Sequence, residues 1–479
     1  MLNKSGSKNK NLIDVLTVMS GTTAAQLIII ISAPLVTRLY GADSFGLSSL
    51  FSSIVSILVV VVCLRYEMAI MLPKSDEEAI NILILSIIIS FIFSLMLVPF
   101  ILLFESNLII ILNAPGLQNY LWLVPPMVFF TGSFSALSYW IIRRKKFKNL
   151  AFAQVAKATA TSGTQLSAGY MGYATGGNLI GGSVLGQTFA STILSFQVWK
   201  SDKHIIKNFV SRKQMRQCLH HYQNFPLYDV WSGLLNAFSF QMPIFILSIF
   251  FSSTVVGFYS LALLVLLLPT SFIGSAIGQI FYQRSSEAYH KNNGEFATIV
   301  EATVSQLFLI GFPIILSLVI IGGDAFNIVF GSNWTEAGYF SQVLSIWILV
   351  VFVTSPISTI YAIFRKLRIL LIINVILFFI RTIVLIIGGI FNDVYLGLTL
   401  FSLASSIILI AMGIHILKIS KISIRHLCDS VKYYLVLGSF CLVLIFIIRN
   451  IFLNNPQMVI ILSVVIIMPY YFILLYKYY

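Results

Sequence analysis

The stretch AINILILSIIISFIFSLMLVPFILL, residues 79–103, carries no charged side chain in 25 residues. A helix of this length crosses a hydrocarbon layer of about 30 Å, whereas a core helix of a water-soluble protein is shorter and amphipathic. Similar runs recur along all 479 residues, of which 58% are apolar and 10% are charged. This composition excludes a mainly water-soluble protein and predicts an all-α, polytopic membrane fold.

We expect about fourteen transmembrane helices joined by short polar breaks, with no extramembrane domain. Breakers such as Pro73 and Gly322-Gly323 separate the runs. The first run is too long for the apolar region of a signal peptide, so we expect it to be retained. The predicted spans are residues 13–36, 43–64, 79–103, 120–141, 149–170, 178–199, 226–250, 253–278, 302–322, 339–360, 368–389, 395–416, 432–448 and 457–476.

The distribution of basic residues predicts the orientation. Of the 30 Lys and Arg residues, 26 fall in segments on one side of the predicted spans, and the opposite loops hold only Arg38 and Arg449. The positive-inside rule therefore predicts cytoplasmic N- and C-termini in a cell inner membrane. The same rule accounts for the net charge of +14 without a nucleic-acid partner. The four cysteines lack metal-ligand spacing, so we expect no disulfide framework, metal or cofactor.

A weak internal repeat divides the chain. Asp14-Val15 recurs as Asp229-Val230, and Gln26 recurs as Gln241 at the same offset. We therefore predict an N-terminal lobe over residues 1–205, a second lobe of six helices over 206–425, and a helix pair over 426–479. Transporters built from such repeats commonly bind substrate between the repeats, near the bilayer midplane.

Two basic residues, Lys157 and Arg381, lie inside predicted spans, where an ionisable side chain is costly. Thr161 and Gln165 follow Lys157 on the same helix face, and Asn374 precedes Arg381. These residues predict a cationic, hydrated lumen. The alternative is a pair of structural cations that bind another helix or reach the membrane surface.

Further residues are weaker candidates for a transport path. Gln26 and Asn236 are small polar positions in the first and seventh spans, which also suit helix packing. Arg38 and Arg65 flank the second span and suit either the mouths of a cavity or contacts with headgroups. Asp14 and Asp229 stand near the ends of their spans and suit either ion coupling or helix capping.

Three stretches resemble a known family. Residues 16–51 read LTVMSGTTAAQLIIIISAPLVTRLYGADSFGLSSLF, and residues 268–287 read LPTSFIGSAIGQIFYQRSSE. With the stretch at 222–262, they are similar to Wzx-type oligosaccharide flippases, the polysaccharide-transporter branch of the MATE-like MOP superfamily. Beyond residue 330 the resemblance is confined to hydropathy.

The resemblance implies movement of a polyprenyl-diphosphate-linked oligosaccharide across the membrane by alternating access. Its products would be surface polysaccharides such as the O-antigen of lipopolysaccharide. The expected partners are the lipid-linked oligosaccharide, membrane lipids, a polysaccharide polymerase and glycosyltransferases. A cationic path formed by Lys157, Arg381, Arg38 and Arg65 suits an anionic diphosphate.

Other functions remain open at this stage. A MATE-type antiporter of small cations or drugs shares the fold class but is expected to carry acidic residues in its spans. An integral-membrane glycan polymerase or ligase is expected to carry a large external loop with catalytic residues. The predicted external loops offer only the isolated Asp324 and Glu336, and no phosphate-binding loop occurs, so we expect no enzyme. A structural scaffold would leave the two span cations unexplained.

Overall fold

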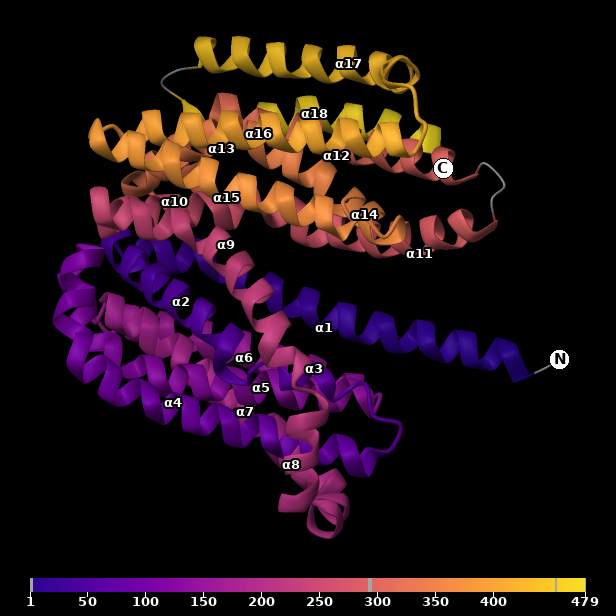
Figure 1. The fold of residues 1–479 in the computed structure, drawn as a ribbon. Helices are drawn as coiled ribbons and strands as arrows, with labels where there is room; N and C mark the ends of the chain where they lie inside the picture. The colour runs from indigo at the N-terminus through magenta and orange to yellow at the C-terminus, as the bar shows by residue number, and fades with distance from the viewer. Residues whose placement is uncertain (1–2, 292–294, 453–454, 479) are drawn as a thin grey trace. The chain divides into compact units, whose positions relative to one another are not determined.

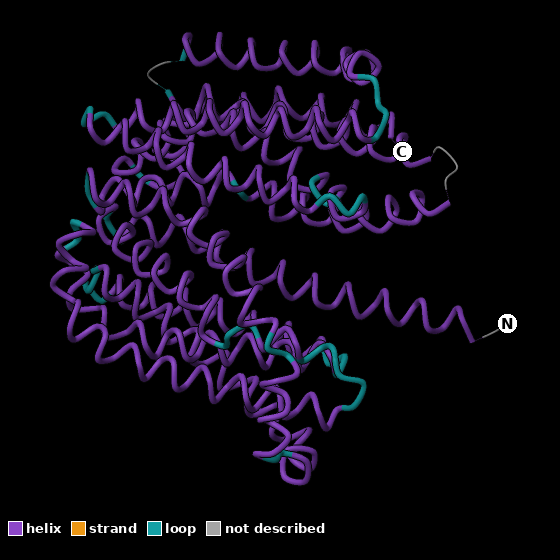
Figure 2. Tube along the Cα trace, viewed as in Figure 1, coloured by secondary structure: helices purple, strands orange, loops and turns teal. Residues whose placement is uncertain are grey.

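A computed structural model describes residues 3–291, 295–452 and 455–478, and Figures 1 and 2 show their helical course. For residues 3–20, 275–276, 290–291, 424, 428, 430 and 477–478 it describes the backbone alone. Every regular element in these ranges is helical, joined by the short loops drawn in teal in Figure 2. The all-α prediction is confirmed.

The chain divides into two compact units, residues Met1–Val256 and Gly257–Tyr479. The predicted lobes 1–205 and 206–425 and the helix pair 426–479 stay a prediction. The first unit contains α1 (Asn3–Leu39), α2 (Ala42–Val62), α3 (Tyr66–Ala69), α4 (Asp76–Leu112), η1 (Pro115–Leu123), α5 (Val124–Arg143), α6 (Phe147–Tyr170), α7 (Gly176–Phe209), α8 (Arg212–His221), η2 (Phe225–Asp229) and α9 (Val230–Phe250).

The second unit begins within α10 (Ser253–Leu266). It continues with η3 (Thr270–Gly274), α11 (Ser275–Lys291), α12 (Glu295–Phe330), η4 (Ser332–Trp334), α13 (Thr335–Ile357), α14 (Ile360–Ile363), α15 (Leu367–Ile390), α16 (Val394–Ile419), α17 (Ile424–Ile451) and α18 (Pro456–Tyr478). In this unit α12 packs against α13, α17 and α18, and α16 packs against α13 and α15.

Twelve helices of the described ranges are long and apolar enough to cross a membrane, and the bent pair formed by α10 and residues 270–289 makes a thirteenth if it is counted as one span. The predicted fifth span, α6, is a helix of 24 residues whose composition is more polar. It packs between α1 and α7, so neighbouring helices cover part of its surface. Together these helices confirm about fourteen transmembrane helices.

Close helix packing in the first unit depends on glycine at a few positions. A Cβ atom at Gly186 of α7 would lie 2.0 Å from Thr161 Oγ1 of α6, and one at Gly182 would lie 2.7 Å from Gln165 Cγ. Only glycine lets α6 and α7 approach this closely. Such small-residue contacts replace the hydrophobic effect as the basis of helix association in a membrane.

Polar contacts with α12 hold both ends of α17 in the second unit. Arg449 Nε donates to Asp324 Oδ2 of α12 at 3.0 Å, and His426 Nδ1 lies 2.7 Å from Glu301 Oε1 of the same helix. Asp324 is therefore paired, whereas the sequence left it isolated. Glu336 accepts a hydrogen bond from Tyr395 at 2.7 Å.

Candidate functional site

A cluster of three charged residues lies where α2 ends. After Val62 the backbone leaves the helix, and Leu64 and Arg65 adopt positive φ angles of 49° and 63°. This break starts the short helix α3 and directs Arg65 toward the start of α9. Arg65 Nε lies 3.4 Å from Asp229 Oδ2. The structure thus brings together Arg65 and Asp229, which the sequence proposed for separate roles.

Gly233 makes room for the guanidinium of Arg65. A Cβ atom at this position would lie 2.1 Å from Arg65 Nη2, so only glycine lets the guanidinium lie against α9 in this way. Four residues earlier, Asp229 ends the π-helical segment η2. Such wide turns are frequent at functional sites.

Glu67 is the third member of this cluster and was missed by the sequence analysis. Its side chain is 4% exposed, and Oε2 has no hydrogen-bond partner among the described residues. Burial raises the pKa of the Glu67 carboxyl to about 7, and the Asp229 charge adds to this, whereas a backbone hydrogen bond and Arg65 lower it. The carboxyl therefore titrates near neutral pH. An acidic residue in the apolar stretch 66–73, directly after a span, was the available signal.

The cluster borders an open pocket. Asp229 and Ser232 line a cavity of about 670 Å³ together with Asn224, Phe225 and Tyr228. Within the cluster, Arg65 Nε and Asp229 Oδ2 face each other at 3.4 Å without forming a hydrogen bond, and Glu67 Oε2 has no hydrogen-bond partner in the described part of the chain. Polar atoms that are buried without partners are costly unless a ligand or ion satisfies them. The arrangement can therefore bind a charged ligand or exchange a proton.

Lys157 lies on α6 among apolar side chains. Its Nζ is 5.9 Å from the centroid of the Phe134 ring, and no carboxylate of the described residues lies within ion-pair distance. Of the polar residues that follow it, Gln165 donates to the Leu179 carbonyl at 2.9 Å, and Thr161 lies against Gly186. Both side chains contact α7, so the polar residues that follow Lys157 lie in the interface between α6 and α7.

Arg381 of α15 occupies an aromatic site in the second unit. Its guanidinium carbon lies 5.3 Å from the ring centroids of both Trp347 and Phe401, and Nε donates to Ser405 Oγ at 3.0 Å. No acidic residue of the described ranges pairs with it. Cation–π contacts stabilise a desolvated guanidinium without neutralising its charge.

The remaining predicted residues are dispersed. Arg38, Asn236 and Asn374 are exposed, Gln26 is half-buried on α1, and the side chain of Asp14 lies outside the described residues. Gln241, the proposed counterpart of Gln26, accepts a hydrogen bond from Ser53 of α2 at 2.9 Å.

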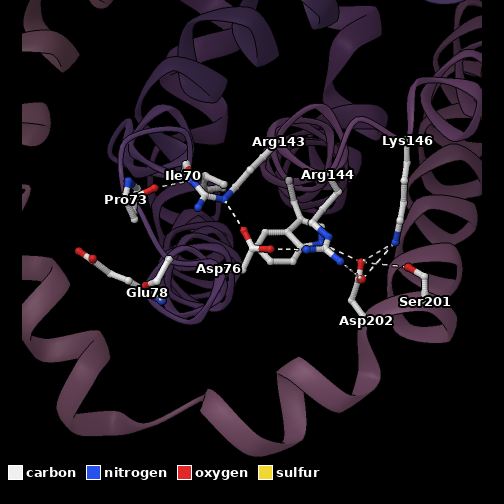
Figure 3. A network of polar contacts seen from close by, with 11 residues as sticks. Ile70, Pro73, Asp76, Glu78, Arg143, Arg144, Lys146, Ser201 and Asp202 are labelled. Carbon is white, nitrogen blue, oxygen red and sulfur yellow. Dashed lines mark hydrogen bonds and ion pairs between the residues drawn. The ribbon is translucent and has the colours of Figure 1, made fainter. Parts of the chain in front are cut away.

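A second charged cluster of the first unit is fully bonded (Figure 3). Asp76 pairs with Arg143 at 2.9 Å and with Arg144. Asp202, with its side chain 1% exposed, lies 3.1 Å from Lys146 Nζ and accepts from Trp140 Nε1 at 3.1 Å. These basic residues were assigned to membrane orientation alone, but they also join α4, α5 and α7.

Comparison with known proteins gives one family and one fold. Residues 35–339 match the family described as "Polysaccharide biosynthesis protein". No curated protein sequence matches the chain. The fold is similar to that of the lipid II flippase MurJ in an inward closed conformation, with a TM-score of 0.74 and 13% identity over 97% of this chain and 99% of that one.

Drug transporters share the fold as well. An inward-facing multidrug resistance MATE family transporter of the MOP superfamily has a TM-score of 0.62 and 14% identity, over 84% of this chain and 95% of its own. A MATE protein in complex with MaD3S has a TM-score of 0.52 and 13% identity, over 85% and 96%. At such low identity these similarities concern the fold alone.

Proposed function

From the premise that the chain belongs to the polysaccharide biosynthesis protein family, we propose that it is a flippase for lipid-linked oligosaccharides. Its substrate would be an oligosaccharide on a polyprenyl diphosphate, moved from the cytoplasmic to the outer leaflet by alternating access. The product would serve surface polysaccharide synthesis. Transport of this kind needs no covalent chemistry by the chain itself.

The observation that carries this proposal is positive charge inside the spans without a neutralising acid. Lys157 and Arg381 lie within α6 and α15, and neither forms an ion pair among the described residues. A structural cation in a membrane usually pairs with an acid or with backbone carbonyls. Unpaired cations suit a diphosphate, whose oxygens accept several charge-assisted hydrogen bonds.

An apolar groove suits the lipid part of such a substrate. Residues of α12 and α18, among them Leu318 and Phe472, line a cavity of about 950 Å³ in the second unit. The lining is almost entirely aliphatic and aromatic. A polyprenyl chain could lie there while its diphosphate contacts cations.

Coupling to an ion gradient belongs to the cluster at the end of α2. Arg65, Glu67 and Asp229 combine a buried carboxyl, a partly exposed carboxylate and one cation. A proton on Glu67 removes a negative charge beside Arg65, so proton binding would favour binding of the diphosphate. Asp14 stays a second candidate. We place the termini and this cluster at the cytoplasmic side of the inner membrane by the positive-inside rule.

Charge substitutions test the function in a strain that lacks its own flippase. Lys157→Arg and Arg381→Lys should retain glycan export, whereas Lys157→Gln and Arg381→Gln should lose most of it at normal levels of membrane-inserted protein. Normal export by the double Gln variant would contradict a cationic path. Efflux of a cationic dye without glycan export would favour the alternative, a MATE-type antiporter, whose acids would be Glu67 and Asp229.

A further inference from the structure

One face of α7 is exposed from Leu185 to the end of the helix and changes character near residue 199. Leu185, Phe189, Phe196 and Trp199 are exposed by between 48% and 67%. At about 100° per residue they fall within one arc of the helix, so this face is in contact with lipid chains. Trp199 is the last of them, and tryptophan is enriched at the membrane–water interface.

The helix continues past the bilayer core. Its 34 residues span about 51 Å at 1.5 Å per residue, well beyond a hydrocarbon layer of about 30 Å. Lys200, Lys203 and Lys207 continue the lipid-facing arc, all three are exposed, and none forms an ion pair within the described ranges. Lys203 and Lys207 follow Trp199 by about 6 and 12 Å along the axis, a distance similar to the Debye length at physiological salt.

Asp202 fixes this rotation of the helix. It is the only acidic residue between positions 200 and 221, and its buried carboxylate is bonded to Lys146 and Trp140 on the inner side of α7 (Figure 3). The three lysines are therefore held on the outer side. Without these bonds the end of α7 could rotate about its axis, and the three lysines would not be held on the lipid-facing side.

The helix α8 extends the basic surface. Arg212, Lys213 and Arg216 are exposed within one arc of this helix, whereas Met215 and Cys218 pack on the core beneath. A pocket of about 1530 Å³ between α8 and the start of α4 is lined by these three cations and by Glu77 and Glu78. Positive charge is therefore in excess there, and α8 lies at the edge of the first unit (Figure 1).

We propose that these six residues, Lys200, Lys203, Lys207, Arg212, Lys213 and Arg216, form a binding surface for the anionic phospholipid headgroups of the adjoining leaflet. Continuity with the lipid-facing arc favours a membrane over an acidic protein or a nucleic acid. Each Lys or Arg close to an anionic membrane contributes a factor of roughly five in affinity. The proposal does not depend on the identity of the transported substrate.

Native mass spectrometry of the purified full-length protein with phosphatidylglycerol or phosphatidylcholine tests this surface. The wild type should retain phosphatidylglycerol at least about tenfold better. A variant with all six residues changed to Gln should lose this preference, whereas Arg212→Lys with Arg216→Lys should keep it. All six side chains are exposed, so the variant should stay monodisperse in size-exclusion chromatography.

The matched comparison uses two triple variants with the same change of charge. Lys200→Gln, Lys203→Gln and Lys207→Gln together should reduce the preference at least about fivefold. Arg365→Gln, Lys366→Gln and Arg368→Gln, three exposed basic residues where α15 begins, should change it less than twofold. Equal losses in both would overturn the proposal, because net charge alone would then explain binding. Displacement of the lipid by millimolar inorganic phosphate would also overturn it, since the surface would then be a site for soluble anions.

Discussion

The first unit contains two charged clusters that differ in how well their polar atoms are bonded. In the cluster of Asp76 and Asp202, both carboxylates bind cations and Asp202 also accepts from Trp140. In the cluster of Arg65, Glu67 and Asp229, the ion pair is 3.4 Å long, and Glu67 Oε2 has no hydrogen-bond partner among the residues that the structure describes.

This difference distinguishes charged residues that stabilise the fold from charged residues that are available for function. A fully bonded network gains from every contact and loses stability when one member is removed. A partly bonded cluster beside an open pocket has bonding capacity left for a ligand or a proton. Sequence position does not distinguish the two, since both lie at the ends of predicted spans.

Removing the cations of the bonded cluster should have the largest effect. Arg144→Gln with Lys146→Gln leaves the Asp202 carboxylate buried without its positive partners, which should cost about 3–5 kcal/mol of folding free energy. Thermal unfolding and the yield of monodisperse protein measure this loss. Adding Asp202→Asn should restore part of the stability, whereas a further loss would show that the network is not electrostatic in origin.

Glu67→Gln should remove a pH dependence of stability. A carboxyl whose pKa is about 7 in the folded protein, against 4.5 ordinarily, favours the folded state below about pH 4.5. That contribution, on the order of 3 kcal/mol, is lost as pH rises through about 7. Among the described residues, Arg65, Asp229, Tyr139 and Cys63 are charged or titratable groups that interact with it. The melting temperature of the wild type should fall between pH 5 and pH 8 relative to the variant, and parallel curves would contradict this titration.

Changes at Arg65 should affect transport more than folding. Arg65→Gln should reduce glycan export by more than about tenfold at normal protein level, because a charge-assisted contact is lost. Arg65→Lys should retain more export than Arg65→Gln. Equal export by Arg65→Gln and wild type would assign the cluster to structure, like its bonded neighbour.

Gly233→Ala tests the position of the Arg65 guanidinium without changing any charge. The new methyl group would displace the Arg65 guanidinium, whose flexible end can move, so folding should change little. Export should fall by about threefold to tenfold. Gly163→Ala is the matched control, because a Cβ atom there has no neighbour within 4 Å. Similar effects of both substitutions would remove the positional role of Gly233.

The sequence predicted the helices better than the site. Runs such as residues 79–103 are long and uncharged, and a membrane-spanning helix needs little else, so the prediction of about fourteen helices is confirmed. The resemblance to polysaccharide transporters is confirmed by the family match. The contact between Arg65 and Asp229 joins residues 164 positions apart and depends on the positive φ angles at Leu64 and Arg65, which no periodicity predicts. Glu67 is buried by tertiary packing alone. Thr161 and Gln165 formed a visible stripe, but the glycines of α7 that cover it could not be matched to it from the sequence.

The most direct test of the central claim is leaflet exchange in proteoliposomes that contain only the purified protein and a labelled polyprenyl-diphosphate oligosaccharide. A membrane-impermeant reagent that modifies the sugar measures the fraction in the outer leaflet over time. The wild type should make almost all of the substrate accessible, Arg65→Gln should slow this exchange, and empty vesicles should show half. Two results would contradict the account. In one, wild-type vesicles behave like empty vesicles; in the other, vesicles with Arg65→Gln exchange the lipid at the same rate as wild-type vesicles.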